Sequence, residues 1–397
     1  MIKIQMAVIL LLLHGALLVQ AHAEPQKDPP IIDTGIIGSG ACWYDTERLI
    51  IVKRSPFKAG QESEVEGLYV LTPTKPREAT KIDLFPVEPE LQKWIWDVRC
   101  HDGTIVFSVP TPDKKRSRLY GVKIGGRPEL LVEMRGAMSQ NMSMKGKYVL
   151  AYKHMRGNKG VYEDEDNCVI QFIKPEFKVH CVDARAALRR WPLANFVLAE
   201  YQWSDTIKVP GPDGQPKVVP NPETQLTDKD GKPINYAMFL RDFKGATLVN
   251  ILEDPVFAPW ITDGFVFTAD ESFMYSACSV RNNPIGLADG VCRRRLAAGL
   301  QLWEEVFRSE IPRKHKASIS NVKVSPTGDL YFIIGGTKAP YHGVWKYSTQ
   351  TKQVTQLTNP GNFYDNPTAI SPNGRWVAFS RTGTVGNSAF LVQGGEK

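Results

Sequence analysis

The sequence lacks the short motifs that identify many enzymes. It contains no Gly-x-Ser-x-Gly elbow, no phosphate-binding loop, no dinucleotide fingerprint and no His-Glu-x-x-His pair, so hydrolase, nucleotide and zincin chemistry have no local signature here. No two cysteines show Cys-x-x-Cys spacing, which disfavours a zinc site. The histidines beyond the N-terminal segment are scattered along the chain: His101, His154, His180, His315 and His342. We therefore expect neither a metal nor a cofactor.

Long apolar runs are confined to the N-terminus. Lys3 precedes an apolar stretch from Met6 to Val19, and the small-residue pattern Ala21-His22-Ala23 follows it. This arrangement predicts a cleavable signal peptide over residues 1–23, cut after Ala23. No later stretch approaches the roughly 18 apolar residues that a membrane span needs. We expect a periplasmic or secreted protein, with no transmembrane segment in the mature chain 24–397.

Neither the composition nor the charge is extreme. The 397 residues are 42% hydrophobic and 23% charged, with 32 Gly and 28 Pro, which excludes collagen-like, low-complexity and disordered chains. The net charge of +7 is mild for this length. In an exported protein, the basic runs at 114–118, 293–295 and 313–316 favour an acidic glycan, an anionic lipid surface or an acidic patch of an envelope protein as the partner, and not nucleic acid.

Helical periodicity is scarce, whereas short strand patterns recur along the chain. Typical examples are 49–52, 104–108, 147–151 and 376–379, which are rich in β-branched and aromatic residues and are bounded by turn residues. Such segments predict an all-β fold. One stretch, 295–307, fits either a helix interrupted by a glycine or a strand.

The strands recur in a repeated frame. Ser325-Pro-Thr-Gly and Ser371-Pro-Asn-Gly each lead into an apolar strand, and the segments that start at Cys100 and Ser143 fit the same pattern. The first apolar residues of the repeated strands are Leu49, Ile105, Tyr148, Phe273, Leu330 and Trp376. Their spacings of 56, 43, 125, 57 and 46 residues leave room for one further unit near Phe196. A period of about 50 residues is typical of propeller blades, which predicts a β-propeller of seven blades, with six as the alternative.

The frame at Ser325 and Ser371 resembles the TolB-like, WD-repeat-like propeller repeat. The small residue Ser380 and the pair Leu357-Thr358 also match that repeat. The resemblance implies a propeller and an exported setting. The α/β domain that precedes the propeller in TolB has no counterpart here, so the resemblance covers the propeller portion only and does not carry over a cellular role. We expect residues 24–397 to form a single propeller domain.

A ring of blades has to be closed. The last unit has only 21 residues after Trp376, which is too few for all of its remaining strands. A strand from Ile31 to Ile37 would complete that blade and cover its open edge. The sequence therefore predicts closure by an N-terminal strand.

The six cysteines can be paired. In a hairpin around 173–176, Cys168 lies directly opposite Cys181, which favours a cross-strand disulfide. Cys278 and Cys292 flank a loop between two successive strands, and Cys42 and Cys100 pair by exclusion. An exported protein permits such bonds. Buried free thiols are the alternative.

Loops of very different length follow the second strand of each unit. Because strands alternate in direction, the segments 54–67, 110–118, 153–167, 204–234 and 281–290 gather on one face, which we call the loop face. Binding residues are common in such loops. Our candidate binding residues on this face are Lys114, Lys115, Arg116, Arg156 and Lys159. Solvated loops that aid solubility are the alternative interpretation of these charges.

Two functions remain open. The first is a monomeric, non-enzymatic propeller of the periplasm or cell envelope that binds an envelope protein or an acidic glycan through the loop face. The alternative is a propeller enzyme, a carbohydrate lyase or hydrolase, whose site is assembled from several blades and leaves no local motif. The absence of a visible catalytic constellation favours the binding protein.

Overall fold

The structure is a computed structural model. It describes residues 30–57, 63–101, 103–113, 116–135, 138–145, 148–153, 167–173, 176–182, 187–192, 197–202, 205–210, 215–221, 225–227, 230–241, 247–260, 265–268, 270, 272–283, 286–296, 301–335, 342–361, 363–383 and 386–394. From 134 to 202 it describes the backbone only. The described chain is almost entirely strand, as the sequence predicts.

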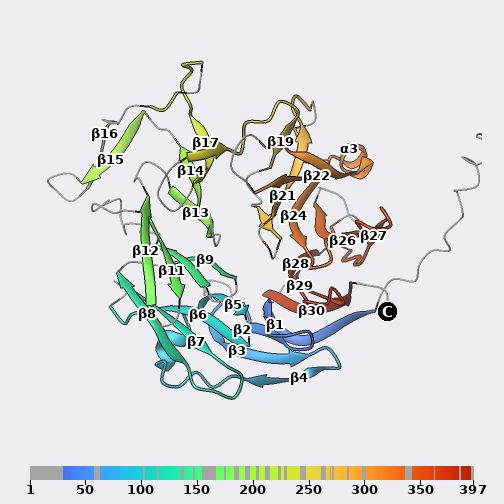
Figure 1. The fold of residues 1–397 in the computed structure, drawn as a ribbon. Helices are drawn as coiled ribbons and strands as arrows, with labels where there is room; N and C mark the ends of the chain where they lie inside the picture. Colours follow the sequence, from blue (N-terminus) through green and yellow to red (C-terminus); the bar gives the residue numbers. More distant parts are fainter. Residues whose placement is uncertain are drawn as a thin grey trace, which may run out of the picture.

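Antiparallel sheets succeed one another around a centre (Figure 1). One sheet contains β5 (Trp96–His101), β6 (Thr104–Pro110), β7 (Arg116–Val122) and β8 (Glu129–Arg135). The next contains β9 (Met138–Lys145), β10 (Tyr148–Lys153), β11 (Asn167–Ile173) and β12 (Glu176–Val182). A third contains β13 (Ala187–Pro192), β14 (Val197–Gln202), β17 (Tyr236–Arg241) and β18 (Thr247–Asn250). The hairpin of β15 (Thr206–Pro210) and β16 (Pro216–Pro220) is inserted between β14 and β17.

The C-terminal half continues the pattern. A five-stranded sheet contains β19 (Phe257–Pro259), β20 (Val266–Phe267), β21 (Phe273–Val280), β22 (Gly290–Arg295) and β23 (Glu304–Arg308). It is followed by β24 (Ser318–Val324), β25 (Leu330–Gly335), β26 (Val344–Tyr347) and β27 (Val354–Gln356). A seven-stranded sheet has the order β28 (Tyr364–Ile370), β29 (Trp376–Gly383), β30 (Gly386–Gln393), β1 (Ile31–Trp43), β2 (Leu49–Arg54), β3 (Val65–Thr72) and β4 (Lys75–Lys81). Two short helices, α2 (Pro89–Gln92) and α3 (Glu310–His315), precede β5 and β24.

The first strands of neighbouring sheets contact one another around the centre. β1 lies beside β5 and β28, β5 beside β9, β9 beside β13, and β24 beside β28. On its other side β24 contacts β21, which is the second strand of the neighbouring sheet along the path from β19. Sheets arranged radially, with their first strands innermost, form a β-propeller. The predicted fold class is therefore confirmed, whereas the expected count of seven blades stays a prediction.

The strand β1 closes the ring. Its first half pairs with β30, with Ile31 opposite Val392, and its second half pairs with β2, with Trp43 opposite Leu49. Closure by an N-terminal strand is therefore confirmed. The bend between the halves needs glycine: Gly38 has φ +145°, and a Cβ there would lie 2.1 Å from the carbonyl oxygen of Val52.

The repeated frame marks the turn between the first and second strands of a unit. In two units this turn is closed by a hydrogen bond from the amide of Gly328 to the carbonyl of Ser325, and from Gly374 to Ser371. Both glycines have positive φ, a conformation that glycine adopts without steric cost. The expected unit near Phe196 is present as well, since its second strand, β14, begins at Val197.

Apolar cores lie between neighbouring sheets. Ile50 and Leu68 of the first unit pack in one cluster with Ile105 and Phe107 of the next. All four are fully buried, and burying a side chain of this size contributes roughly 1.5–3 kcal/mol. The ambiguous stretch 295–307 belongs to this strand-based packing, because its end forms β23 and not a helix. Sheet packing therefore decides the structure of a segment whose own pattern fits both.

Two of the predicted disulfides are present. Cys42–Cys100 joins β1 to β5, and Cys278–Cys292 joins β21 to β22. In the third hairpin the predicted register is confirmed, with Cys168 opposite Cys181, but the side chains of these two cysteines lie outside the described residues. Their disulfide stays a prediction.

The two disulfides are compatible with an oxidising, exported setting. No helix within the described ranges is long and apolar enough to cross a membrane. The expected signal peptide lies outside the described residues, so cleavage after Ala23 and a periplasmic or secreted location stay predictions.

Candidate binding site at the channel mouth

A pocket of about 1140 Å³ lies at the centre of the ring. Its walls come from the inner strands β1, β5, β24 and β28, from the loop between β2 and β3, and from the segment between α2 and β5. The β2–β3 loop belongs to the loop face, and the α2–β5 segment lines the same pocket. The pocket is thus the mouth of the central channel on the loop face, and it exceeds the roughly 300–1,000 Å³ typical of small-molecule sites.

Two cations define the inner end of the pocket. Lys323 comes from β24 and Arg99 from β5. Burial in the channel, together with the nearby positive charge of Arg99, lowers the pKa of Lys323 to about 8. Within the described part of the chain Lys323 makes no ion pair.

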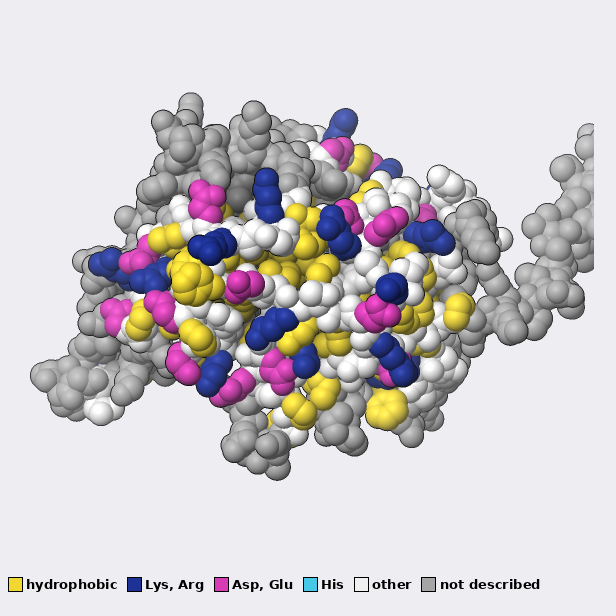
Figure 2. All heavy atoms as spheres, turned by 90° about the horizontal axis from the view of Figure 1, so that it is seen from below, with side chains coloured by type: hydrophobic (Ala, Val, Ile, Leu, Met, Phe, Trp, Pro, Cys, Tyr) yellow, Lys and Arg dark blue, Asp and Glu magenta, His cyan; other side chains and the backbone are white. Residues whose placement is uncertain are grey.

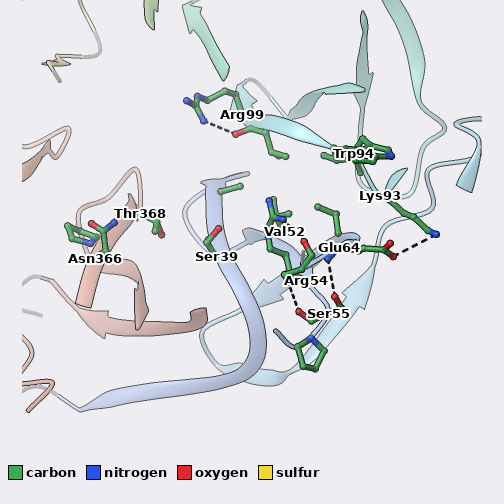
Figure 3. Close-up of a pocket in the computed structure, with 18 of the residues that line it drawn as sticks. Ser39, Val52, Arg54, Ser55, Glu64, Lys93, Trp94, Arg99, Asn366 and Thr368 are labelled. Carbon is green, nitrogen blue, oxygen red and sulfur yellow. Dashed lines mark hydrogen bonds and ion pairs between the residues drawn. The ribbon is translucent and has the colours of Figure 1, made fainter. Parts of the chain in front are cut away.

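Polar side chains continue the wall around these cations. The side-chain amide of Asn321 donates to the side-chain oxygen of Asn366 and, over 3.3 Å, to the carbonyl of Pro367. These contacts tie β24 to β28. Ser39 and Thr368 add hydroxyl groups to the lining, and Figure 3 shows Asn366 and Thr368 on one side of the pocket, with Trp94 and Lys93 on the opposite side.

The outer end of the pocket is built from two connecting segments. The guanidinium of Arg54 donates to the carbonyl of Ser63 over 3.1 Å, which holds the base of the β2–β3 loop. Lys93 lies 3.7 Å from Glu64 and 3.2 Å from Glu90, and hydrogen bonding to Glu90 raises its pKa. Here, unlike at Lys323, the cation has carboxylate partners. Trp94, next in sequence, is 40% exposed.

The disulfide Cys42–Cys100 fixes the walls of the inner end. Cys42 follows Ala41 on β1, Cys100 follows Arg99 on β5, and Ala41 and Arg99 both line the pocket. The bond therefore holds two inner strands, which are far apart in sequence, at the place where the cations lie. A covalent link at this point preorganises the pocket.

The outer side of the ring carries balanced charge. In the view of Figure 2, basic and acidic side chains are interspersed over the described surface. Several of them are paired, including Lys53 with Glu66 at 2.8 Å and Lys75 with Glu78 at 2.8 Å. Surface pairs of this kind contribute about 0–1 kcal/mol.

Of the five binding residues predicted from sequence, only Arg116 is described. It begins β7, is exposed, and pairs with Glu133 at 3.0 Å. Arg116 is not among the residues that line the pocket. Lys114, Lys115, Arg156 and Lys159 lie outside the described residues, so their role stays a prediction.

The histidines do not converge in the described part of the chain. His342 is buried next to Tyr364, with ring centres 4.4 Å apart and the rings edge to face. His315 ends α3. Nowhere in the described ranges do three or more His, Cys, Asp or Glu side chains come close enough to hold a metal ion.

The comparisons with known proteins support the fold. No protein-family model and no curated protein matches the chain. A prolyl endopeptidase structure matches with a TM-score of 0.51 and 10% identity, over 90% of this chain and 47% of that one. The β-propeller domain of the Trilobed protease from Pyrococcus furiosus matches at 0.48 and 11%, over 91% and 94%. The tricorn protease matches at 0.45 and 11%, over 90% and 34%.

This chain therefore spans about a third of the tricorn protease and about half of the prolyl endopeptidase. An oligogalacturonate lyase and the WD40 domain of Sif2 are also among the matches, with TM-scores of 0.46 and 0.40. Identities this low show the fold alone. The TolB-like family stays a prediction.

Sequence reasoning missed the residues of the channel mouth. Arg99 lies one residue before the repeated turn frame and Lys323 two residues before it. The repeat places that part of each unit on the inner strand. A search for basic residues at these positions would have found both, whereas a search for clustered charges found only the loops.

Proposed function

We propose that the protein is an exported, non-enzymatic binding propeller whose channel mouth on the loop face captures a negatively charged ligand. The observation that carries this proposal is Lys323, an ammonium group inside a large pocket, beside Arg99 and without a carboxylate partner among the described residues. Charges inside proteins are usually paired. A ligand carboxylate would supply the missing partner.

The pocket favours binding over catalysis. Its described lining contains one carboxylate, Glu64, which lies near Lys93. General acid–base chemistry needs a positioned pair of titratable groups with separated roles. Cations, amides and hydroxyls instead form a set of donors suited to holding an anion.

The proposal keeps two expectations from the sequence. Export would remove residues 1–23, which N-terminal sequencing of the mature protein would detect. The basic loop residues, including Arg116 and the cluster that begins at Lys114, would add outer contacts for the ligand. Charge reversal at such rim positions should mainly slow association and reduce its salt dependence.

The test is a comparison of two lysines. Lys323→Met and Lys75→Met each remove one positive charge, but Lys75 lies on the outer strand β4, with its side chain 65% exposed. Binding of a hexuronate oligomer and of a glutamate peptide would be measured by calorimetry at low and at physiological salt. We expect Lys323→Met to weaken binding of an anionic probe at least about tenfold, the equivalent of 1.4 kcal/mol.

Lys75→Met should bind like the unmodified protein. If neither probe binds the unmodified protein, or if both variants weaken binding equally, the channel mouth is not the anion site and the proposal fails.

A further inference from the structure

The mouth of the channel combines its cations with exposed aromatic rings. Trp94 lines the pocket and is 40% exposed, and Tyr364 is 51% exposed. Phe57, which follows the lining residue Pro56, is 55% exposed. A single exposed aromatic needs no explanation, but several around one polar pocket mark a binding surface.

The backbone of Trp94 is firmly held although its ring is exposed. Its amide donates to the carbonyl of Leu91 over 2.9 Å, at the end of α2. The flanking residues Leu91 and Ile95 are buried. The ring therefore stands on an anchored turn, so that little conformational freedom is lost when a ligand covers it.

Tyr364 lies on β28, the inner strand that carries the lining residues Asn366 and Thr368. It shares a face of β28 with Asn366, two residues further on, because strand side chains alternate, and this places it about 7 Å along the strand from Asn366. Its ring contacts the buried His342 edge to face and is not part of the pocket lining. Trp94 is therefore the exposed ring that shares the pocket with the cations, amides and hydroxyls.

We infer that the ligand of the mouth is an acidic polysaccharide, with one sugar ring stacked on Trp94 and a carboxylate held by Lys323 and Arg99. The inference rests on the proposed function and names the chemistry of its ligand. The C–H face of a pyranose ring is apolar and suits the electron-rich face of an indole. Hydroxyl groups of the sugar match Ser39, Thr368 and the amides of Asn321 and Asn366.

An acidic peptide would use the same pocket differently. Its carboxylates sit on flexible side chains and can reach Lys323 without any flat surface. A hexuronate carries its carboxylate on the ring, so that stacking and charge pairing occur together. The volume of about 1140 Å³ leaves room for more than one sugar.

The experiment measures the contribution of the Trp94 ring to binding separately from the contribution of the ligand's charge. Trp94→Leu keeps apolar bulk and removes the flat ring, and Phe85→Leu is its matched control, since Phe85 is 62% exposed in the same β4–β5 connection and does not line the pocket. Calorimetry of the mature protein would use a short hexuronate oligomer, a neutral hexose oligomer of equal length, and a glutamate peptide with as many carboxylates. Circular dichroism and the melting temperature would establish that each variant folds.

We expect the hexuronate oligomer to bind more tightly than either other probe. Trp94→Leu should weaken its binding by about tenfold, because the sugar loses the flat ring on which it stacks, and Phe85→Leu should not. If the glutamate peptide binds as tightly as the oligomer and Trp94→Leu affects neither, the ligand is an acidic peptide and this inference is wrong, although the proposed anion site stands. If no anionic probe binds, both fail.

Discussion

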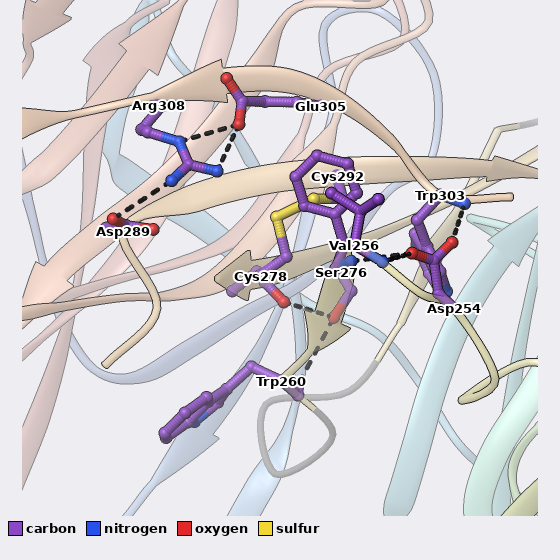
Figure 4. Close-up of a disulfide and its surroundings, with 12 residues drawn as sticks. Asp254, Val256, Trp260, Ser276, Cys278, Asp289, Cys292, Trp303, Glu305 and Arg308 are labelled. Atoms are coloured by element: carbon purple, nitrogen blue, oxygen red, sulfur yellow. Dashed lines mark hydrogen bonds and ion pairs between the residues drawn. A yellow bond between two sulfur atoms is a disulfide. The ribbon is translucent and has the colours of Figure 1, made fainter. Parts of the chain in front are cut away.

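Two buried carboxylates in the C-terminal half are paired with arginines, whereas a lysine at the channel mouth has no ion pair among the described residues. Asp365 is fully buried and accepts two hydrogen bonds of 2.7 Å from Arg381. Asp289 is fully buried and lies 3.6 Å from Arg308 (Figure 4). Lys323 at the mouth has no such partner in the described ranges. Arginines compensate these two buried carboxylates, whereas no carboxylate among the described residues compensates Lys323.

The same contrast is visible in the pKa values of the cations. Hydrogen bonding to Asp365 raises the pKa of Arg381, because the partner stabilises the charged form. Burial lowers the pKa of Lys323 to about 8, because the channel removes water without supplying an anion. For Lys323 burial and the nearby Arg99 disfavour the charged form, whereas for Arg381 the hydrogen bond to Asp365 outweighs the effect of burial.

The largest expected effect comes from breaking a compensated pair. Asp365→Asn leaves Arg381 partly buried without its anion, and such losses cost about 3–5 kcal/mol. Urea unfolding of the variant should show this decrease in the free energy of unfolding. Replacing both partners, with Asp365→Leu and Arg381→Met, should recover part of it. A single variant as stable as the unmodified protein would show that these buried pairs are not required.

The second-largest expected effect comes from opening a disulfide that lies away from the pocket. It tests whether the stability of the protein can change while anion binding stays the same. Cys278→Ala with Cys292→Ala opens a disulfide of sequence separation 14 between two fully buried residues, away from the pocket. Closing a loop of this length contributes about 3 kcal/mol in the chain-entropy model. Unfolding should therefore become easier, while anion binding measured well below the melting temperature stays unchanged. A parallel loss of binding would mean that this sheet and the mouth act as one unit.

Many turns and strand pairings of the propeller form between residues that are close together in the sequence, which explains why they could be predicted. The turn at Ser371 to Gly374 and the register that sets Cys168 opposite Cys181 depend on neighbouring residues, and the structure has both. Closure by the strand from Ile31 could be predicted because the last unit has too little chain to cover its own edge.

The residues of the candidate site are far apart in the sequence, and reasoning from the sequence missed most of them. Lys323, Arg99 and Trp94 come from different units and meet only when the ring forms. Each is unremarkable within its own segment, where Lys323 simply alternates with apolar residues of a strand. The missing counter-charge of Lys323 depends on tertiary neighbours, which no sequence pattern contains.

Removal of the Lys323 charge at the mouth should change the free energy of unfolding by a smaller amount and in the opposite direction. Lys323→Met removes a desolvated, unpaired ammonium, so the free energy of unfolding near neutral pH should increase by about 1–2 kcal/mol, less than the full pKa shift implies because the side chain retains some solvent. Asp365→Asn removes a charge and destabilises, whereas Lys323→Met removes a charge and stabilises. Chemical unfolding of both variants under one condition checks the contrast. Destabilisation by Lys323→Met would show that its charge is compensated.

The smallest effect is the pH dependence of binding. In the proposed complex the protonated Lys323 binds the anion. Because the pKa of Lys323 is about 8, its charged fraction falls from roughly nine-tenths near pH 7 to one-tenth near pH 9. Affinity for an anionic probe should fall by up to about tenfold over this range. In the same window the free protein should gain stability, since its unfolded chain, with the ordinary lysine pKa of 10.5, binds more protons than the folded one.

Lys323→Arg separates this titration from any other group, because a guanidinium stays charged throughout the range. Its affinity for the anionic probe should be independent of pH, and its extra stability at high pH should disappear. Calorimetry at several pH values would check the first expectation and urea unfolding the second. If the unmodified protein and Lys323→Arg lose affinity equally, another group controls binding, and the open charge at the mouth is not the one that the ligand neutralises.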